Sequence, residues 1–188
     1  TNTIYITFLL SLRDAGTSSG RIFSLRNVSY DFCSVFAKKN DSSTYKLGID
    51  KDAANDIFLT STLNFNQTYL ICIRYSFIDG SDNDVMYLWI NPIINSEPTT
   101  LSSSISQTTL SDPSISTFNK FCWHNDNTGY SPTGYFDAVR IAVGATSAEA
   151  WTNLKALRTA TYSNLDGGNL YQAPQCTATG NDQPVGRF

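Results

Sequence analysis

The chain has 188 residues, of which 41% are hydrophobic and only 15% are charged, and its formal net charge is −3. This length fits one domain with a full hydrophobic core, and the charged fraction is below the roughly one quarter of an average globular chain. The acidic balance without a basic stripe argues against nucleic acid binding. No apolar run approaches the ~20 residues that a membrane-spanning helix needs.

Segments rich in β-branched and aromatic residues follow one another along most of the chain, separated by turn residues, and such segments predict strands. The expected strands cover residues 3–12, 20–27, 30–39, 43–49, 56–62, 67–78, 83–92, 116–124 and 135–144. The segment 67–78 is the strongest, and we expect it to pair with 83–92 as a hairpin. The polar stretch 95–116 predicts an extended surface crossing with a short strand inside it.

One helix is expected after the last strand. Thr146 and Glu149 have the spacing of a capping box, in which two side chains satisfy free backbone N–H groups at a helix start. Trp151 and Leu154 follow at helical spacing, which predicts a short helix over about 147–158. The fold class is therefore all-β, an antiparallel β-sandwich (jelly roll) with one short helix. Residues 1–160 would form this domain, with 161–188 as a loop-like tail packed on it or tethered to it.

The stretch FDAVRIAVG, residues 136–144, carries an acidic and a basic residue close together. In a regular strand, successive side chains alternate between the two faces. Asp137 and Arg140 would then point to opposite faces, so neither a direct pair nor a catalytic dyad is expected. We expect Asp137 to accept backbone N–H groups from the preceding turn and Arg140 to bond a neighbouring strand or loop.

The cysteines and the Asn-x-Ser/Thr sequences indicate in which compartment the protein is found. The four cysteines are Cys33, Cys72, Cys122 and Cys176. No pair has CxxC spacing, which disfavours a zinc site, and an even number in a chain rich in Ser, Thr and Asn indicates two disulfides in an oxidising, extracellular setting. Three pairings are open, and the alternative is four reduced, half-buried thiols. Candidate N-glycosylation sites are Asn27, Asn40 and Asn66.

Two stretches resemble a known family. NDVMYLWINP (83–92) has Asp before a hydrophobic strand that ends in Trp-Ile-Asn-Pro, and FDAVRIAVGATSAEAW (136–151) has Asp-x-Val-Arg before a Gly and a capped helical turn. They are similar to the paired signatures of laminin-G-like, concanavalin-A-like jelly-roll modules of bacterial cell-surface proteins. The likeness spans roughly residues 5–158. The longer helix region, the cysteines and the tail depart from the family pattern.

The resemblance implies that strands are missing in front of the segment 3–12, because such modules usually begin further upstream. A sandwich without its first strands leaves an exposed sheet edge, and exposed edges pair with other chains. The candidate residues for self-association are Ile4, Ile6, Phe8 and Leu10. Strand donation between copies would produce filaments. The alternative, held equal, is that the sequence is a fragment whose own upstream residues fill the gap.

Catalysis has little support in the sequence. Glycan hydrolysis needs two carboxylates on one strand face, but the only glutamates, Glu97 and Glu149, fall in a Pro-containing loop and at a helix cap. The single histidine, His124, has no serine or cysteine nucleophile in a recognisable turn. We therefore expect a protein without enzymatic activity.

Calcium is the one cofactor that the sequence suggests. The turn 79–84 offers the oxygen ligands that calcium prefers, and its candidate ligands are Asp79, Asp82 and Asp84. The favoured alternative is a hairpin turn, in which Asp, Gly, Ser and Asn belong for conformational reasons.

Glycan binding is a further candidate, at the segment 123–135. Aromatic and polar side chains gather there, as they do in sugar-binding sites. The candidates are Trp123, Asn125, Asp126, Tyr130 and Tyr135. The favoured alternative places Trp123 in the core and the tyrosines at the rim of a long hairpin.

Together these features predict a non-enzymatic structural subunit of a cell-surface layer or fibre, extracellular and self-associating through sheet edges or strand donation, with adhesion as an extension of that role. The alternative is a lectin-like carbohydrate-binding module, assisted by calcium. The expected partners are copies of the same chain and, second, glycans, with no nucleic acid and no membrane insertion.

Overall fold

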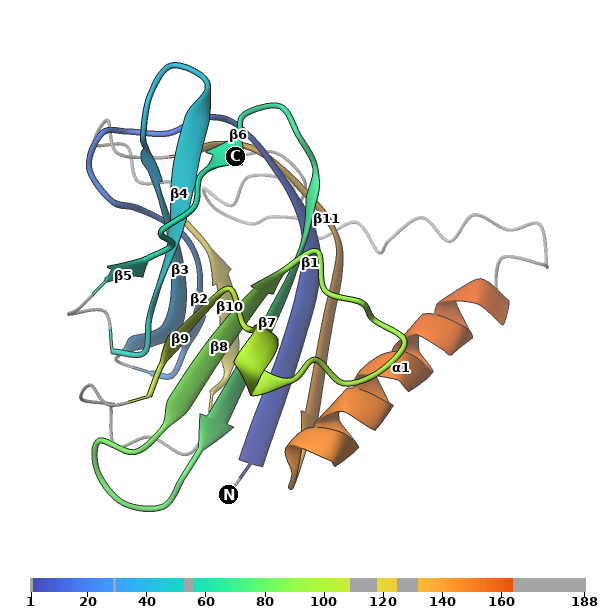
Figure 1. Ribbon diagram of the computed structural model, residues 1–188. Helices are drawn as coiled ribbons and strands as arrows, with labels where there is room; N and C mark the ends of the chain where they lie inside the picture. Colours follow the sequence, from blue (N-terminus) through green and yellow to red (C-terminus); the bar gives the residue numbers. More distant parts are fainter. Residues whose placement is uncertain (1, 29, 53–55, 109–117, 125–131, 164–188) are drawn as a thin grey trace, which may run out of the picture.

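Two antiparallel sheets pack face to face, and one helix lies on the outer face of the first sheet (Figure 1). The computed structural model describes residues 2–28, 30–52, 56–108, 118–124 and 132–163. The expected fold class, an antiparallel β-sandwich with one helix, is confirmed. No helix within these ranges is long and apolar enough to cross a membrane.

Each sheet joins strands that are distant in the sequence. Sheet 1 has the order β11-β1-β7-β8-β9, and sheet 2 has the order β10-β2-β3-β4-β5, with β6 paired to β4. The strands of sheet 1 are β1 (Asn2–Asp14), β7 (Tyr69–Phe77), β8 (Val85–Ile90), β9 (Ile105–Gln107) and β11 (Thr133–Gly144). The strands of sheet 2 are β2 (Gly20–Arg26), β3 (Asp31–Lys39), β4 (Thr44–Asp50), β5 (Ile57–Phe58), β6 (Leu63–Asn64) and β10 (Lys120–Trp123). Every predicted strand segment overlaps one of these strands, the short strand β6 lies outside the predicted segments, and β9 is the short strand expected inside 95–116.

The first strand, β1, lies inside sheet 1 and not at its edge. It pairs with β7 on one side and with β11 on the other, where Thr3 faces Gly144 and Leu12 faces Gly134. The four proposed self-association residues, Ile4, Ile6, Phe8 and Leu10, are all fully buried between the two sheets. The predicted exposed edge at the N-terminal strand is therefore wrong, because a strand from the far end of the domain occupies the neighbouring position.

The helix α1 (Ser147–Ser163) begins where the capping box predicts. The backbone N–H of Glu149 donates to Thr146 Oγ1 at 3.2 Å, and the Glu149 carboxylate accepts the N–H of Ala145 at 2.9 Å. The helix ends later than predicted, so residues 161–163 belong to it and not to the tail. Residues 164–188 lie outside the described residues.

A glycine lets the helix pack closely on sheet 1. At Gly144, the last residue of β11, an added Cβ would lie 2.9 Å from the Cα of Ala150 in the first turn of α1. That distance is shorter than side-chain atoms tolerate, so the close approach needs glycine there. The helix buries its apolar face against the outer face of sheet 1, in a cluster of Tyr5, Cys72, Trp89, Ala142, Ala150, Trp151 and Leu154.

A β-bulge in β11 changes which residues share a face. Thr7 of β1 pairs with Arg140, but Leu9 pairs with Asp137, so β11 has one residue more than β1 in this interval. The extra residue sits at Ala138, whose φ of 53° is in the left-handed region. Since Thr7 and Leu9 share the outer face, Asp137 and Arg140 share it too. The prediction that they point to opposite faces is wrong, because strict alternation does not survive a bulge.

The expectation of two disulfides is wrong. Cys33, Cys72 and Cys122 are free thiols, so the structure does not contain the two predicted disulfides, and Cys176 lies outside the described residues. Cys33, on β3 of sheet 2, packs in the core between the sheets, and Cys72, on β7 of sheet 1, packs under the helix. Burial raises the pKa of the Cys72 thiol to about 12 and that of Cys33 still further, so neither is an ionised, reactive thiol at neutral pH.

Candidate binding pocket

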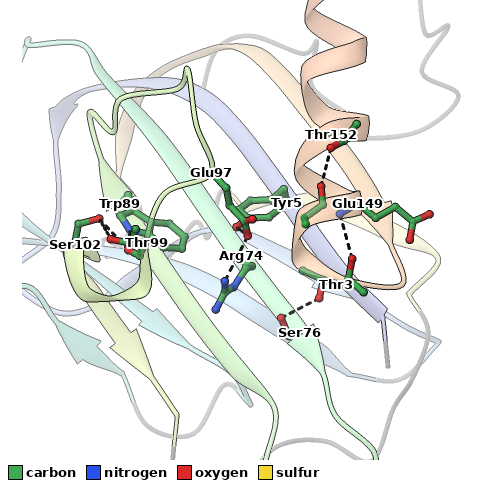
Figure 2. A network of polar contacts seen from close by, with 12 residues as sticks. Thr3, Tyr5, Arg74, Ser76, Trp89, Glu97, Thr99, Ser102, Glu149 and Thr152 are labelled. Carbon is green, nitrogen blue, oxygen red and sulfur yellow. Dashed lines mark hydrogen bonds and ion pairs between the residues drawn. The ribbon is translucent and has the colours of Figure 1, made fainter.

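The outer face of sheet 1 is bordered by α1 on one side and by the segment 91–104 on the other. That segment contains a short 3-10 helix, Thr100–Ser102, and polar contacts hold it to the sheet (Figure 2). The indole Nε1–H of Trp89 donates to the carbonyl of Thr99 at 3.0 Å, and the Tyr5 hydroxyl donates to Glu97 at 2.8 Å. Burial and the hydrogen bond to Glu97 hold the pKa of Tyr5 well above its usual range, which keeps this donor protonated.

A second charged residue fixes the same segment. The Arg74 guanidinium on β7 lies 3.8 Å from the Glu97 carboxylate and 4.5 Å above the ring centre of Tyr87. Figure 2 shows Tyr5, Arg74 and Glu97 converging from two strands and the covering segment. Both borders of the outer face are thus anchored, the first by helix packing and the second by this network.

A cavity of about 290 Å³ lies between the two borders. Its lining residues are Thr7, Leu9, Leu70, Ile94, Ala138, Arg140, Trp151, Leu154 and Lys155. The strands β1, β7 and β11 form its floor, the helix gives one wall, and Ile94 contributes from the covering segment. Aliphatic and aromatic side chains dominate the lining, and two basic side chains join them.

The two basic groups give the cavity its polar character. The side chain of Arg140 is half-buried, and its guanidinium makes no hydrogen bond or ion pair with any of the described residues. Trp151 is 3% exposed, and its buried indole Nε1–H has no hydrogen-bond partner among those residues. Lys155 lies four residues after Trp151 on α1 and is exposed. No carboxylate lines the cavity, because Asp137 points its Oδ1 at the backbone N–H of Ala138, 2.6 Å away.

Sequence reasoning missed this site. The helical spacing of Trp151 and Leu154 located one wall, but nothing in the pattern indicated that the bulge brings Arg140 to the same face. The prediction that Arg140 bonds a neighbouring strand or loop is wrong for the described residues. Most of the turn to which Asp137 was predicted to bond, residues 125–131, lies outside the described residues, and among the described residues Asp137 accepts the N–H of Ala138.

The proposed glycan site is only partly within the described residues, since Asn125, Asp126 and Tyr130 lie outside them. Trp123 packs in an aromatic cluster, with its ring stacked on Phe136 at 3.7 Å between centroids and edge-on to Phe8 at 5.3 Å. Tyr135 is 37% exposed, with the Arg13 guanidinium 4.4 Å above its ring. Trp123 is thus half-buried and packs against the core between the sheets, and the glycan site stays a prediction.

The proposed calcium ligands do not converge. Asp84 is 3% exposed and accepts hydrogen bonds from the Tyr75 hydroxyl at 2.8 Å and the Ile78 N–H at 2.6 Å. Asp79 and Asp82 are exposed in the turn, where Asp82 has a φ of 61°. Across the described ranges, no group of three or more His, Cys, Asp or Glu side chains could hold a metal ion. Asp84 thus fixes the hairpin, which is the role that the favoured alternative to a calcium site gave to this turn.

His124 does have a serine neighbour, which the sequence did not reveal. Its Nε2 lies 2.7 Å from Ser24 Oγ, and Ser24 donates its proton to Asp31 Oδ1 at 3.0 Å. Because serine has one hydroxyl proton, the histidine is the donor in this pair. A nucleophilic serine needs the opposite polarity, with histidine as the base. Ser24 is also fully buried, so this cluster is structural.

The three sequon asparagines lie in turns. Asn40 and Asn66 are exposed, whereas Asn27 is half-buried and its side-chain oxygen accepts the N–H of Tyr30 at 2.9 Å. Asn40 donates to Asp41 and Thr44, both at 3.0 Å. Glycosylation at these positions stays a prediction.

The fold and the cavity define an antiparallel β-sandwich with a helix-bordered pocket on one outer face. No family model and no curated protein matches the chain. Among solved structures, it is similar to a native heptameric SAP-like pentraxin from Limulus polyphemus, with 12% identity and a TM-score of 0.41. The match covers 74% of this chain and 63% of the pentraxin chain, which is less than two thirds of that chain. The resemblance to bacterial laminin-G-like modules stays an expectation from the sequence.

Proposed function

We propose that the protein is a non-enzymatic binding module that holds a small organic molecule in the pocket between α1 and sheet 1. The observation that carries this proposal is a cavity of about 290 Å³ with a mostly apolar lining and a few converging polar groups. Ligand sites are concave, largely apolar and oriented by a small number of polar groups, and typically begin near ~300 Å³.

The kinds of side chain in the lining favour binding over chemistry. They are aliphatic residues, an indole, a hydroxyl and two basic groups, and none is a carboxylate, an imidazole or a thiol. General acid–base catalysis near neutral pH relies mostly on those missing types. The groups present can orient a ligand through hydrogen bonds and shield its apolar part from water.

The test is to fill the pocket. A neutral polarity-sensitive fluorophore, N-phenyl-1-naphthylamine, should bind with 1:1 saturation and a rise in fluorescence. Leu9→Trp places a large ring in the cavity and should weaken binding by about tenfold or more, since it removes most of the ligand's contact area. The matched control is Leu101→Trp, because Leu101 is 99% exposed on the 3-10 helix and lies outside the pocket. Equal binding by both variants would contradict the proposal.

Self-association is a second candidate function, now through β11. Within the described residues this strand pairs only with β1, and it presents Val139 and Val143, which are 37% and 44% exposed. A second copy could pair along the remaining side of the strand. Light scattering at high concentration tests this, with Val143→Asp expected to return oligomers to monomer and Val28→Asp, at a site 86% exposed, as the control. A wild-type protein that stays monomeric would end this proposal.

A further inference from the structure

We infer that the ligand of the pocket is an organic anion, a carboxylate with a short apolar tail. This inference rests on the proposed function and names the ligand class for the same site. The carboxylate would sit at Arg140, and the tail would lie on the aliphatic side chains of the floor and the helix wall.

Arg140 brings a positive charge to the cavity lining. A guanidinium carries five N–H donors, stays charged at all physiological pH values and accepts no hydrogen bond. Arg140 is half-buried in the lining of an apolar cavity, and it has no hydrogen-bond or ion-pair partner among the described residues. Partial burial of a charge is unfavourable unless it is paired. A carboxylate supplies the matching acceptor, because its two oxygens fit the guanidinium fork in a bidentate pair.

Trp151 brings a buried indole to the same lining. Trp151 Nε1–H is a donor without an acceptor, although buried polar groups are normally hydrogen-bonded. Unlike Trp89, whose Nε1–H donates to Thr99, Trp151 lines the cavity while its Nε1–H lies buried without an acceptor among the described residues. The unpaired groups of the lining residues are thus donors, and Arg140 is the charged one. An acceptor-rich ligand group matches Arg140, whereas an ammonium group, which only donates, does not.

The backbone of β11 is irregular beside Arg140. Regular alternation would put Arg140 on the inner face with Phe136, between the sheets. The bulge at Ala138 instead turns Arg140 to the outer face, at the cost of a left-handed φ of 53° for a residue with a side chain. Bulges commonly re-aim a side chain beside a functional site, and strained backbone gathers at ligand sites. The strand is deformed at the point that delivers the cation to the cavity.

The apolar part of the lining indicates that the ligand also has an apolar tail. Leu9, Leu70, Ile94 and Leu154 form a continuous aliphatic lining with the ring of Trp151. An inorganic anion such as phosphate would leave this surface uncovered. The cavity, about 290 Å³, is at the small end of ligand pockets, which typically span ~300–1,000 Å³, so the tail is short.

The experiment compares three probes of one shape, hexanoate, hexanamide and hexylamine, by displacement of the fluorophore and by calorimetry at low salt. Hexanoate should bind about fivefold more tightly than hexanamide, because hydrogen bonds to charged groups are stronger by about 1 kcal/mol. Hexylamine should bind most weakly. Arg140→Gln should remove the preference for hexanoate and leave the affinity for hexanamide nearly unchanged. Arg13→Gln, an arginine outside the cavity, is the control and should preserve the preference.

The outcomes separate the two proposals. If no probe and no fluorophore binds, the proposed function fails and the anion inference fails with it. If hexanamide binds as tightly as hexanoate and Leu9→Trp weakens both, the pocket is a binding site but the anion inference is overturned. A preference for hexanoate that survives Arg140→Gln would also overturn it.

Discussion

Two clusters of polar groups lie in largely apolar surroundings in this protein, and they differ in one respect. At the β7–β8 hairpin, Asp84 accepts from Tyr75 and Ile78, and the ammonium group of the fully buried Lys51 donates to the Asp84 carbonyl at 2.6 Å. In the pocket, Arg140 and the Trp151 indole have no partner in the described structure. The first cluster is closed by its own hydrogen bonds, whereas the donors of the second have no acceptor among the described residues.

Whether a buried polar group is paired within the fold distinguishes structural residues from ligand-binding residues better than the residue type does. An aspartate in a turn suggested calcium, yet its hydrogen bonds show that it fixes a hairpin. An arginine in a strand suggested structure, yet it lines a cavity. Buried polar groups that the fold leaves unpaired are uncommon and need an explanation, and a ligand is one such explanation.

The largest expected effect is in the closed cluster. Asp84→Asn leaves one oxygen to serve two donors, the Tyr75 hydroxyl and the Ile78 N–H, so one of them loses its acceptor. We expect a loss of about 2 kcal/mol in the free energy of unfolding, the typical cost of an unsatisfied buried group. Urea denaturation measures it. Asp82→Asn is the matched control and should be neutral, since Asn tolerates the left-handed φ at this exposed position. A neutral Asp84→Asn would show that the cluster is not closed.

The two buried indoles give a smaller and more direct comparison. Trp89→Phe removes a donor that bonds the Thr99 carbonyl, and Trp151→Phe removes one that bonds nothing. Both changes remove the same atoms from a buried ring, so their difference isolates the hydrogen bond. We expect Trp89→Phe to cost about 1 kcal/mol more than Trp151→Phe. Thermal and chemical denaturation of both variants decide this, and equal losses would mean that the Trp151 indole has an acceptor in solution.

At the β-bulge in β11 we expect a substitution to stabilise the protein, in contrast to the substitutions above. Ala138→Gly should stabilise the protein by about 0.5 to 1 kcal/mol, because glycine adopts a left-handed φ without the penalty of a Cβ. In a regular strand the same change weakens the protein, and Ala142→Gly, at a buried position of the same strand, is the control for that behaviour. The midpoint of urea denaturation measures both. Destabilisation by Ala138→Gly would place Ala138 in regular strand geometry and remove the bulge argument for Arg140.

The sequence predicts features that depend on neighbouring residues in the chain, and it misses features that depend on residues far apart in the chain. Composition and alternation are local, and they located the strands, the hairpin of β7 and β8 and the capped start of α1 at Thr146. The partner of β1 is not local, and so the pairing with β11 was missed and an edge was expected at Ile4 to Leu10. The bulge at Ala138 is one residue in a strand that otherwise alternates, and no local signal marks it. The strand floor of the candidate pocket depends on these non-local features, whereas the helix wall follows from local spacing, which is why only the helix wall could be predicted.

The smallest expected effect on stability is the most informative about the pocket. Because Arg140 has no partner among the described residues, Arg140→Gln breaks no hydrogen bond of the fold, and we expect the free energy of unfolding to change by less than about 0.5 kcal/mol. The same variant should lose its preference for hexanoate over hexanamide. A residue that served the fold would show the reverse, a loss of stability with unchanged binding, as Asp84→Asn should. Measuring both quantities on both variants therefore tests whether the two clusters differ in the way that their hydrogen bonds indicate.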